Sequence, residues 1–172
     1  MIKKILLLST CSALAVSTVN AGAYIGAGAG VSGTSENLNG GTNLATTLLA
    51  GYDFKVLPLL SLGLETQYNY VGKAIDTNGQ SGGMYNIPLY ATATVDLPLG
   101  LNLAAKLGYA YNRFNVNESA IPSTLWRPAA AIQVGYDLFG FNLFFQSSRF
   151  FTDNRGSSSY VGSYTLGLMY KF

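Results

Sequence analysis

Strictly alternating side chains in short segments constrain the fold of this chain more than any other feature. The clearest segment runs from about Leu59 to Val71. One set of its positions holds Leu60, Leu62, Leu64, Tyr68 and Tyr70, and the intervening set holds Ser61, Gly63, Glu65, Gln67 and Asn69. A helix would mix these two sets around its surface, whereas a strand separates them onto opposite faces. The pattern therefore predicts a β-strand with one apolar face and one polar face.

Eight segments of this kind follow one another after residue 21. They are expected at about 23–32, 46–56, 59–71, 84–97, 101–111, 126–138, 142–151 and 163–172. Short turns at 57–58, 98–100 and 139–140 alternate with longer polar connections at Gly33–Asn43, Gly72–Gly83, Arg113–Thr124 and Thr152–Ser158. Membrane barrels have this rhythm of short periplasmic turns and longer external loops. We therefore expect an all-β fold, a transmembrane eight-stranded antiparallel up-and-down β-barrel.

The composition agrees with strands that cross a membrane. Charged residues make up 10% of the chain, against about a quarter in soluble domains. The longest apolar stretches after residue 21 have five residues, whereas a membrane-spanning helix needs about 20. Aromatic residues near the segment ends predict two interfacial girdles. One contains Tyr68, Tyr70, Tyr109, Tyr111, Trp126, Phe150 and Phe151, and the other contains Tyr52, Phe54, Tyr136, Phe139, Tyr170 and Phe172.

The N-terminus has the features of an export signal. Lys3 and Lys4 precede a mostly apolar segment, Ile5–Val16, and small residues allow cleavage after Ala21. Cys11 follows a sequence that only faintly resembles a lipoprotein cleavage site. We expect a cleavable signal peptide over residues 1–21 and a barrel domain over residues 22–172. The mature chain then contains no cysteine and no disulfide.

Neither charge nor motif indicates a nucleic-acid or nucleotide ligand. The chain has ten basic and eight acidic residues, and removal of Lys3 and Lys4 leaves eight of each. No basic surface for nucleic acid is therefore expected. Gly28–Gly33 fits the G-x-G-x-x-G pattern, but a polar connection follows it instead of a helix. We expect these glycines to make room for large side chains inside the barrel, such as Tyr90.

The last residues of the chain carry a more specific sign. Thr165, Gly167, Tyr170 and Phe172 fit the pattern polar-x-Gly-x-x-aromatic-x-Phe, position for position. Over residues 22–172 the sequence resembles the OmpA/OmpX-type eight-stranded outer-membrane barrels of Gram-negative bacteria, in which this pattern is the signal for the barrel-assembly machinery. The resemblance implies a monomer in the outer membrane, surrounded by outer-membrane lipid and lipopolysaccharide. Because the chain ends with the barrel, we expect no peptidoglycan-binding domain.

The sequence lacks the residues on which outer-membrane barrel enzymes depend. In the families similar to this one, lipid A deacylases, lipid A palmitoyltransferases, phospholipases and omptin proteases use a histidine as acid or base, because its pKa lies near neutrality. This chain has no histidine. We expect no enzymatic activity, and a carboxylate or lysine mechanism is the alternative. No connection has carboxylates at calcium-like spacing, so neither a metal site nor a cofactor is expected.

Two sets of polar residues are expected inside the barrel. Counted from the short turns, Glu65 and Lys106 lie at similar depth, and charges removed from water need partners. We therefore expect this pair to form within a polar layer that also contains Thr92, Gln133 and Gln146. The second set faces the periplasmic mouth and contains Asp53, Lys55, Asp96, Asp137 and Lys171.

The size of the barrel leads to two hypotheses about function. Eight strands leave an interior just wide enough for side chains. We expect a filled, structural barrel that displays its external loops to host or cell-surface ligands, since binding commonly lies on loops held by a rigid scaffold. The alternative is a narrow pore or channel for ions or small apolar solutes.

Overall fold

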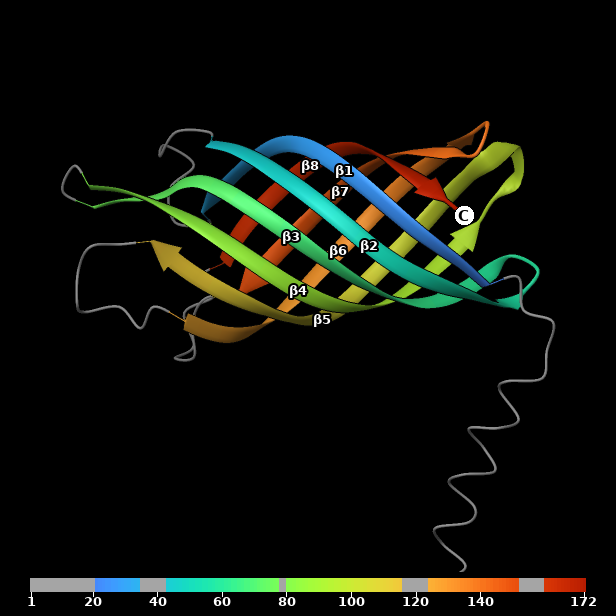
Figure 1. The fold of residues 1–172 in the computed structure, drawn as a ribbon, viewed down its shortest axis with the longest axis horizontal. Coiled ribbons are helices and arrows are strands. Elements are labelled where there is room, and N and C mark those ends of the chain that lie inside the picture. Colours follow the sequence, from blue (N-terminus) through green and yellow to red (C-terminus); the bar gives the residue numbers. More distant parts are fainter. Residues whose placement is uncertain (1–20, 35–42, 78–79, 116–123, 152–159) are drawn as a thin grey trace, which may run out of the picture.

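Eight strands make up most of the computed structural model, which describes residues 21–34, 43–77, 80–115, 124–151 and 160–172. They are β1 (Ala21–Thr34), β2 (Asn43–Leu57), β3 (Leu60–Thr77), β4 (Gln80–Asp96), β5 (Leu101–Asn115), β6 (Thr124–Leu138), β7 (Phe141–Phe151) and β8 (Tyr160–Lys171). Each strand pairs with its sequence neighbours, and β8 pairs antiparallel with β1, so the sheet closes into a barrel (Figure 1). The predicted eight-stranded up-and-down barrel is confirmed. Residues 1–20 of the expected signal peptide lie outside the described residues.

Three short connections lie at one end of the barrel, which we call the turn end; the opposite end is the loop end (Figure 1). Between β4 and β5 the chain forms a 3₁₀ turn, η1 (Pro98–Gly100). Between β6 and β7, Phe139 and Gly140 have φ angles of 49° and 87°. Two successive positive φ angles define a type I′ turn, whose twist matches that of the flanking strands. The C-terminal residue, Phe172, also lies at the turn end.

The strands are staggered, so a row of register partners on successive strands moves steadily along the barrel axis. One row contains Tyr24, Gly51, Glu65, Tyr90, Gly108, Ala129, Phe150, Val161 and Thr34. It returns to β1 ten residues beyond its start, at Thr34 instead of Tyr24. With about 3.3 Å per residue and about 4.8 Å between strands, this stagger gives a strand tilt of roughly 40°. Neighbouring residues of one row therefore lie at different depths in the barrel.

The outer face of the wall is apolar and the inner face is largely polar. Leu64 and Leu107 point outward and are 57% and 68% exposed, whereas their sequence neighbours Glu65 and Lys106 point inward and are each 2% exposed. Exposed aromatic residues gather toward both ends of the strands. They include Tyr68, Tyr70, Tyr109 and Trp126 toward the loop end, and Tyr52, Phe54, Tyr136 and Tyr170 toward the turn end. The alternation in the sequence thus corresponds to the two faces of the wall.

The longest hairpin differs from the sequence-based expectation. The segment Gly72–Gly83 was expected to be a loop, but β3 continues to Thr77 and β4 begins at Gln80. The two strands pair up to Thr77 and Gln80, after a register shift between Val71 and Ile75. Backbone N–H and C=O groups can pair whatever the polarity of the side chains. A polar, glycine-rich sequence therefore signals the end of the apolar wall and not the end of the strands.

Candidate functional site in the barrel interior

Glu65 on β3 and Lys106 on β5 meet in the middle of the interior. The Lys106 Nζ lies 2.7 and 2.8 Å from the two carboxylate oxygens of Glu65. It also donates to the Oε1 atoms of Gln133 at 2.7 Å and Gln146 at 2.8 Å. Both charged side chains are 1% exposed. Buried charges are tolerated when they are paired and their remaining donors and acceptors are used. These four residues of the expected polar layer therefore form one hydrogen-bonded group.

Further polar side chains complete this group, which we call the central network. Glu65 accepts from the Tyr24 hydroxyl at 2.9 Å and from the Gln67 side-chain amide at 2.6 Å. Gln67 and Gln146 exchange two hydrogen bonds of 3.1 and 3.2 Å, and Gln146 also donates to Ser148. These residues come from β1, β3 and β7. The network therefore ties opposite sides of the barrel together across its interior.

Tyr24 reaches Glu65 across the strand that separates them because the residue in between is Gly51. Tyr24 is the register partner of Gly51, which in turn is the partner of Glu65. A Cβ atom on Gly51 would overlap the ring and hydroxyl of Tyr24. The glycine thus provides the space in which the tyrosine lies.

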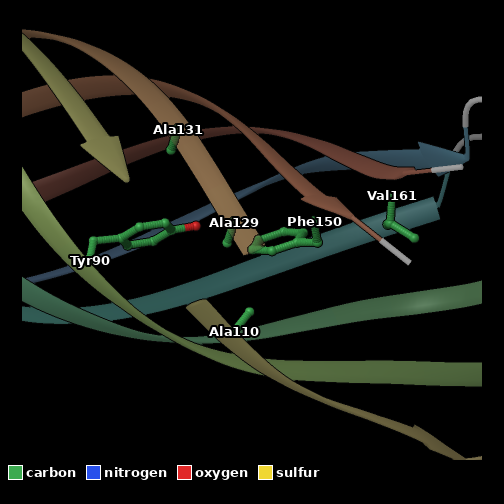
Figure 2. Packing of buried hydrophobic residues seen from close by; sticks show 6 residues of the cluster. All are labelled: Tyr90, Ala110, Ala129, Ala131, Phe150 and Val161. Carbon is green, nitrogen blue, oxygen red and sulfur yellow. The ribbon is translucent and has the colours of Figure 1, made fainter. Parts of the chain in front are cut away.

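Two apolar clusters flank the central network. The turn-side cluster contains Tyr24, Leu49, Phe144 and Met169. The loop-side cluster contains Tyr90, Ala110, Ala129, Ala131, Phe150 and Val161, and Figure 2 shows alanines beside the rings of Tyr90 and Phe150. Interior space is therefore filled by side chains on both sides of the charged pair.

Phe150 corrects one expectation from the sequence. It was expected in the outward aromatic girdle, but it is fully buried in the loop-side cluster. Gln146 and Ser148 already point inward, and successive side chains of a strand alternate between faces. Phe150 follows Ser148 by two residues, so its side chain points inward as well.

The five charged residues expected at the mouth lie near the turn end. The ion pairs are long, 3.8 Å for Lys55 with Asp96 and 3.9 Å for Lys171 with Asp137. A hollow of about 290 Å³ opens here, and Asp53, Lys55, Asp96 and Lys171 line it. Exposed pairs of this kind contribute little to stability. The mouth is therefore a solvent-exposed rim, unlike the buried central pair.

Thr92 lies between the rim and the central pair. It is the register partner of Lys106, but its hydroxyl donates to Asp53 Oδ1 at 3.4 Å. A cavity of about 10 Å³ adjoins Thr92, Glu65 and Lys106. A single water molecule needs about this volume. The structure thus places Thr92 beside the expected polar layer but outside the central network.

The residues of the C-terminal pattern are divided between the inner and outer faces of the barrel. Thr165 points inward and is 1% exposed. A Cβ on Gly28 would lie 2.6 Å from its methyl group, so Gly28 makes room for Thr165 and not for Tyr90 as expected. Tyr170 and Phe172 point outward with their ring centroids 5.1 Å apart. Recognition of this pattern by the assembly machinery stays a prediction.

Sequence reasoning missed Tyr24 and Gln67 as members of the central network. Gln67 carries a signal, since it follows Glu65 by two residues and so shares its face. The signal for Tyr24 is weaker, because its role depends on Gly51 being its partner on the next strand. That partnership follows from the register of two strands and not from either segment alone.

Two further findings concern only the part of the chain that the structure describes. No helix there is long and apolar enough to cross a membrane. No group of three or more cysteine, aspartate or glutamate side chains there is arranged to hold a metal ion.

No protein-family model and no curated protein matches this chain. Among solved structures, Neisserial surface protein A (NspA) is 17% identical with a TM-score of 0.61, and the match covers 87% of this chain and 97% of NspA. Ail, the attachment invasion locus protein of Yersinia pestis, solved with the heparin analogue sucrose octasulfate, is 14% identical with a TM-score of 0.55, covering 88% of this chain and 99% of Ail. The outer-membrane enzyme PagL is 12% identical with a TM-score of 0.57, covering 85% and 98%. This chain therefore has the fold of the small eight-stranded outer-membrane β-barrels, as its resemblance to the OmpA/OmpX type implied.

Proposed function

We propose that this chain is a non-enzymatic, monomeric protein of the Gram-negative outer membrane, whose filled barrel displays its loop-end connections to surface ligands. The filled interior is the observation that carries this proposal. The central network crosses the barrel, and apolar clusters occupy the interior on both sides of it. A rigid scaffold of this kind favours binding through its connections.

The outer surface supports a position in a bilayer that contains lipopolysaccharide. The wall is apolar between two sets of exposed aromatic residues, which suits a hydrocarbon layer between two interfaces. Near the loop end, the guanidinium groups of Arg113 and Arg149 lie 5.8 and 5.0 Å from the ring centroids of Tyr85 and Tyr160. A guanidinium stacked on a ring keeps N–H groups in its plane for phosphate oxygens. The phosphates of lipopolysaccharide would be suitable partners.

The absence of histidine supports a role without enzymatic activity. The fold alone does not decide this point, because PagL, an outer-membrane enzyme, is similar in fold. Overproduction in a Gram-negative host, followed by mass spectrometry of lipid A, tests the proposal. We expect an unchanged spectrum, and a new lipid A species that depends on the protein would show that it is an enzyme.

Planar-bilayer recording of the purified protein tests whether the barrel is filled. We expect no steady ion conductance, because the charged pair and its neighbours block the interior. A sustained conductance at the level of single molecules would contradict the proposal and favour a pore.

A narrow pore is the second candidate function, and the hollow at the turn end favours it. This hollow and the small cavity beside Glu65 and Lys106 are both lined by Asp53 and Lys171. If the pair closes a pore, Glu65→Gln or Lys106→Gln should open or alter conductance. If both variants lower thermal stability without conductance, the filled barrel is favoured.

Surface binding requires its own experiment. Sulfated saccharides are a suitable first probe, since Ail, a barrel of this fold, was solved with a heparin analogue. Intact cells that produce the protein should bind a labelled probe more strongly than cells that produce a variant with the loop-end connections shortened. Equal binding by both would remove the support for loop display to this class of ligand.

A further inference from the structure

Four polar residues form a row across neighbouring strands in the interior, toward the loop end. They are Thr47 on β2, Asn69 on β3, Asn86 on β4 and Asn112 on β5. Each is the register partner of the next. All four are buried, with exposed fractions between 0% and 4%. Such a row can pass hydrogen bonds from strand to strand across the inner face of the wall.

The first part of the row is fully connected. The Thr47 hydroxyl donates to Asn69 Oδ1 at 2.7 Å, and Asn69 Nδ2 donates to Asn86 Oδ1 at 2.8 Å. Asn69 Nδ2 also lies 3.3 Å from Gln67 Oε1, within hydrogen-bonding distance. The row is therefore continuous with the central network around Glu65 and Lys106.

The hydrogen bonds stop between Asn86 and Asn112. The donor Asn86 Nδ2 and the acceptor Asn112 Oδ1 are both buried, and neither has a partner among the described residues. These two side chains are 0% and 1% exposed and belong to directly paired positions. The other atom of each amide is bonded, because Asn86 Oδ1 accepts from Asn69 and Asn112 Nδ2 donates to the Ala110 carbonyl at 3.4 Å. A buried donor or acceptor without a partner is strongly disfavoured. A donor and an acceptor on directly paired positions can be satisfied together by one group placed between them.

We propose that a hydroxyl group binds between Asn86 and Asn112. It would accept a hydrogen bond from Asn86 Nδ2 and donate one to Asn112 Oδ1. A hydroxyl oxygen can do both, whereas a carboxylate or phosphate dianion only accepts and an ammonium group only donates. The hydroxyl belongs either to water or to a saccharide or other polyol, because both have this chemistry.

Tyr90, four residues along β4 from Asn86, carries a further buried polar atom. Its hydroxyl is also buried without a partner among the described residues, and it lies on the same strand as Asn86. Figure 2 shows the Tyr90 hydroxyl directed toward Ala129 and the ring of Phe150, neither of which offers a side-chain hydrogen-bonding group. Strands β4 and β5 thus hold three buried polar side-chain atoms without a partner among the described residues.

A double-mutant cycle tests for the bridging group. Asn86→Leu and Asn112→Leu are made singly and together in the full chain, and thermal unfolding of the refolded proteins is measured in detergent micelles. A bridged pair is coupled, so the midpoint of the double variant should fall by less than the sum of the two single shifts. Additive shifts, or a rise in midpoint for Asn112→Leu, would overturn the proposal.

A matched cycle controls for general effects of replacing buried asparagines. Asn102 lies on β5, as Asn112 does, and is 2% exposed, but it lies near the turn end and contacts Asp137. Asn86→Leu combined with Asn102→Leu should therefore give additive shifts. If this control pair is as strongly coupled as the test pair, the coupling is not specific to the site and the proposal fails.

Nuclear magnetic resonance of the side-chain amides distinguishes the two sources of the hydroxyl. Glucose, N-acetylglucosamine and glycerol are titrated into the labelled protein. A saturable shift of the Asn86 amide signal that is lost in Asn112→Leu identifies a saccharide or polyol. A nuclear Overhauser effect between water and that amide, without any shift on titration, identifies water. The absence of both signals would overturn the proposal.

Discussion

The inner and outer faces of the wall are built from alternating residues of the same strands, yet they are specified in different ways. The outward Leu64 and Leu107 are more than half exposed in the isolated barrel. The inward Glu65 and Lys106 each form hydrogen bonds with several other side chains. The outer face therefore requires only apolar residues, because any apolar side chain suits a lipid surface. The inner face requires particular residues, because each must match its hydrogen-bond partners. Substitutions on the two faces should differ accordingly.

The largest effect is expected for Lys106→Met, on the inner face. It removes the cation and leaves the Glu65 carboxylate buried without its partner, which should lower the free energy of unfolding by about 3 to 5 kcal/mol. Urea unfolding of the protein refolded into vesicles measures the loss. Adding Glu65→Met to this variant should recover part of the stability, because the unpaired charge is then removed.

Lys55→Met at the mouth provides the matched control for Lys106→Met. Lys55 is 40% exposed and lies 3.8 Å from Asp96, so its replacement should change stability by at most about 1 kcal/mol. Equal losses for the two lysine variants would mean that burial does not distinguish the central pair from the rim.

The next largest effect is expected for Leu64→Arg, on the outer face beside Glu65. In a bilayer an arginine at mid-depth of the wall should destabilise the barrel by about 2 to 4 kcal/mol. Leu99→Arg, at a turn residue that is 87% exposed, should cost about 0 to 1 kcal/mol. Similar losses at both positions would contradict the proposed contact of the wall with lipid.

Gly51→Ala should have an intermediate effect. The added Cβ overlaps the Tyr24 ring and displaces its hydroxyl from Glu65, which should lower stability by about 1 to 3 kcal/mol. Gly33→Ala is the control, since nothing lies within 4 Å of a Cβ there. Its effect should stay within about 0.5 kcal/mol. If Gly51→Ala had as little effect on stability as the control, the position of the Tyr24 ring would not depend on the absence of a side chain at Gly51.

The smallest effect is expected for Arg149→Ala, on the outer face near the loop end. Loss of the contact with the Tyr160 ring should lower stability by about 0.5 to 1 kcal/mol in detergent. In vesicles that contain lipopolysaccharide the loss should be larger, because a phosphate partner is lost as well. An identical loss in both media would argue against the proposed phosphate contact.

The same comparison explains what could be predicted from the sequence. The strand number, the turns and the outward apolar residues follow from alternation, because one residue class repeated every second position is visible in a single segment. The positions of Glu65 and Lys106 at similar depth were also accessible, since depth can be counted from the turns. The structure brings their side chains to 2.7 Å.

Features that depend on two or more strands were not accessible in this way. Tyr24 joins Glu65 only because the register places Gly51 between them. Phe150 was assigned to the wrong face because an aromatic residue near a strand end suits either a girdle or an apolar cluster. The β3–β4 hairpin extends beyond the expected strand end because backbone pairing does not require apolar side chains.

The ten-residue stagger of the closed sheet imposes a parity rule on the chain. Each residue faces inward or outward according to whether its position along the strand is odd or even. Because the sheet closes on itself, its stagger must be an even number, or inward residues of β8 would meet outward residues of β1. Insertion of a single residue in the middle of any strand would turn half of that strand inside out, with leucines in the interior and amides on the apolar outer face. Single-residue changes in length are therefore restricted to the two ends of the barrel. In the described strands both register shifts lie there, one of a single residue at 55–57 and one of two residues at 71–75.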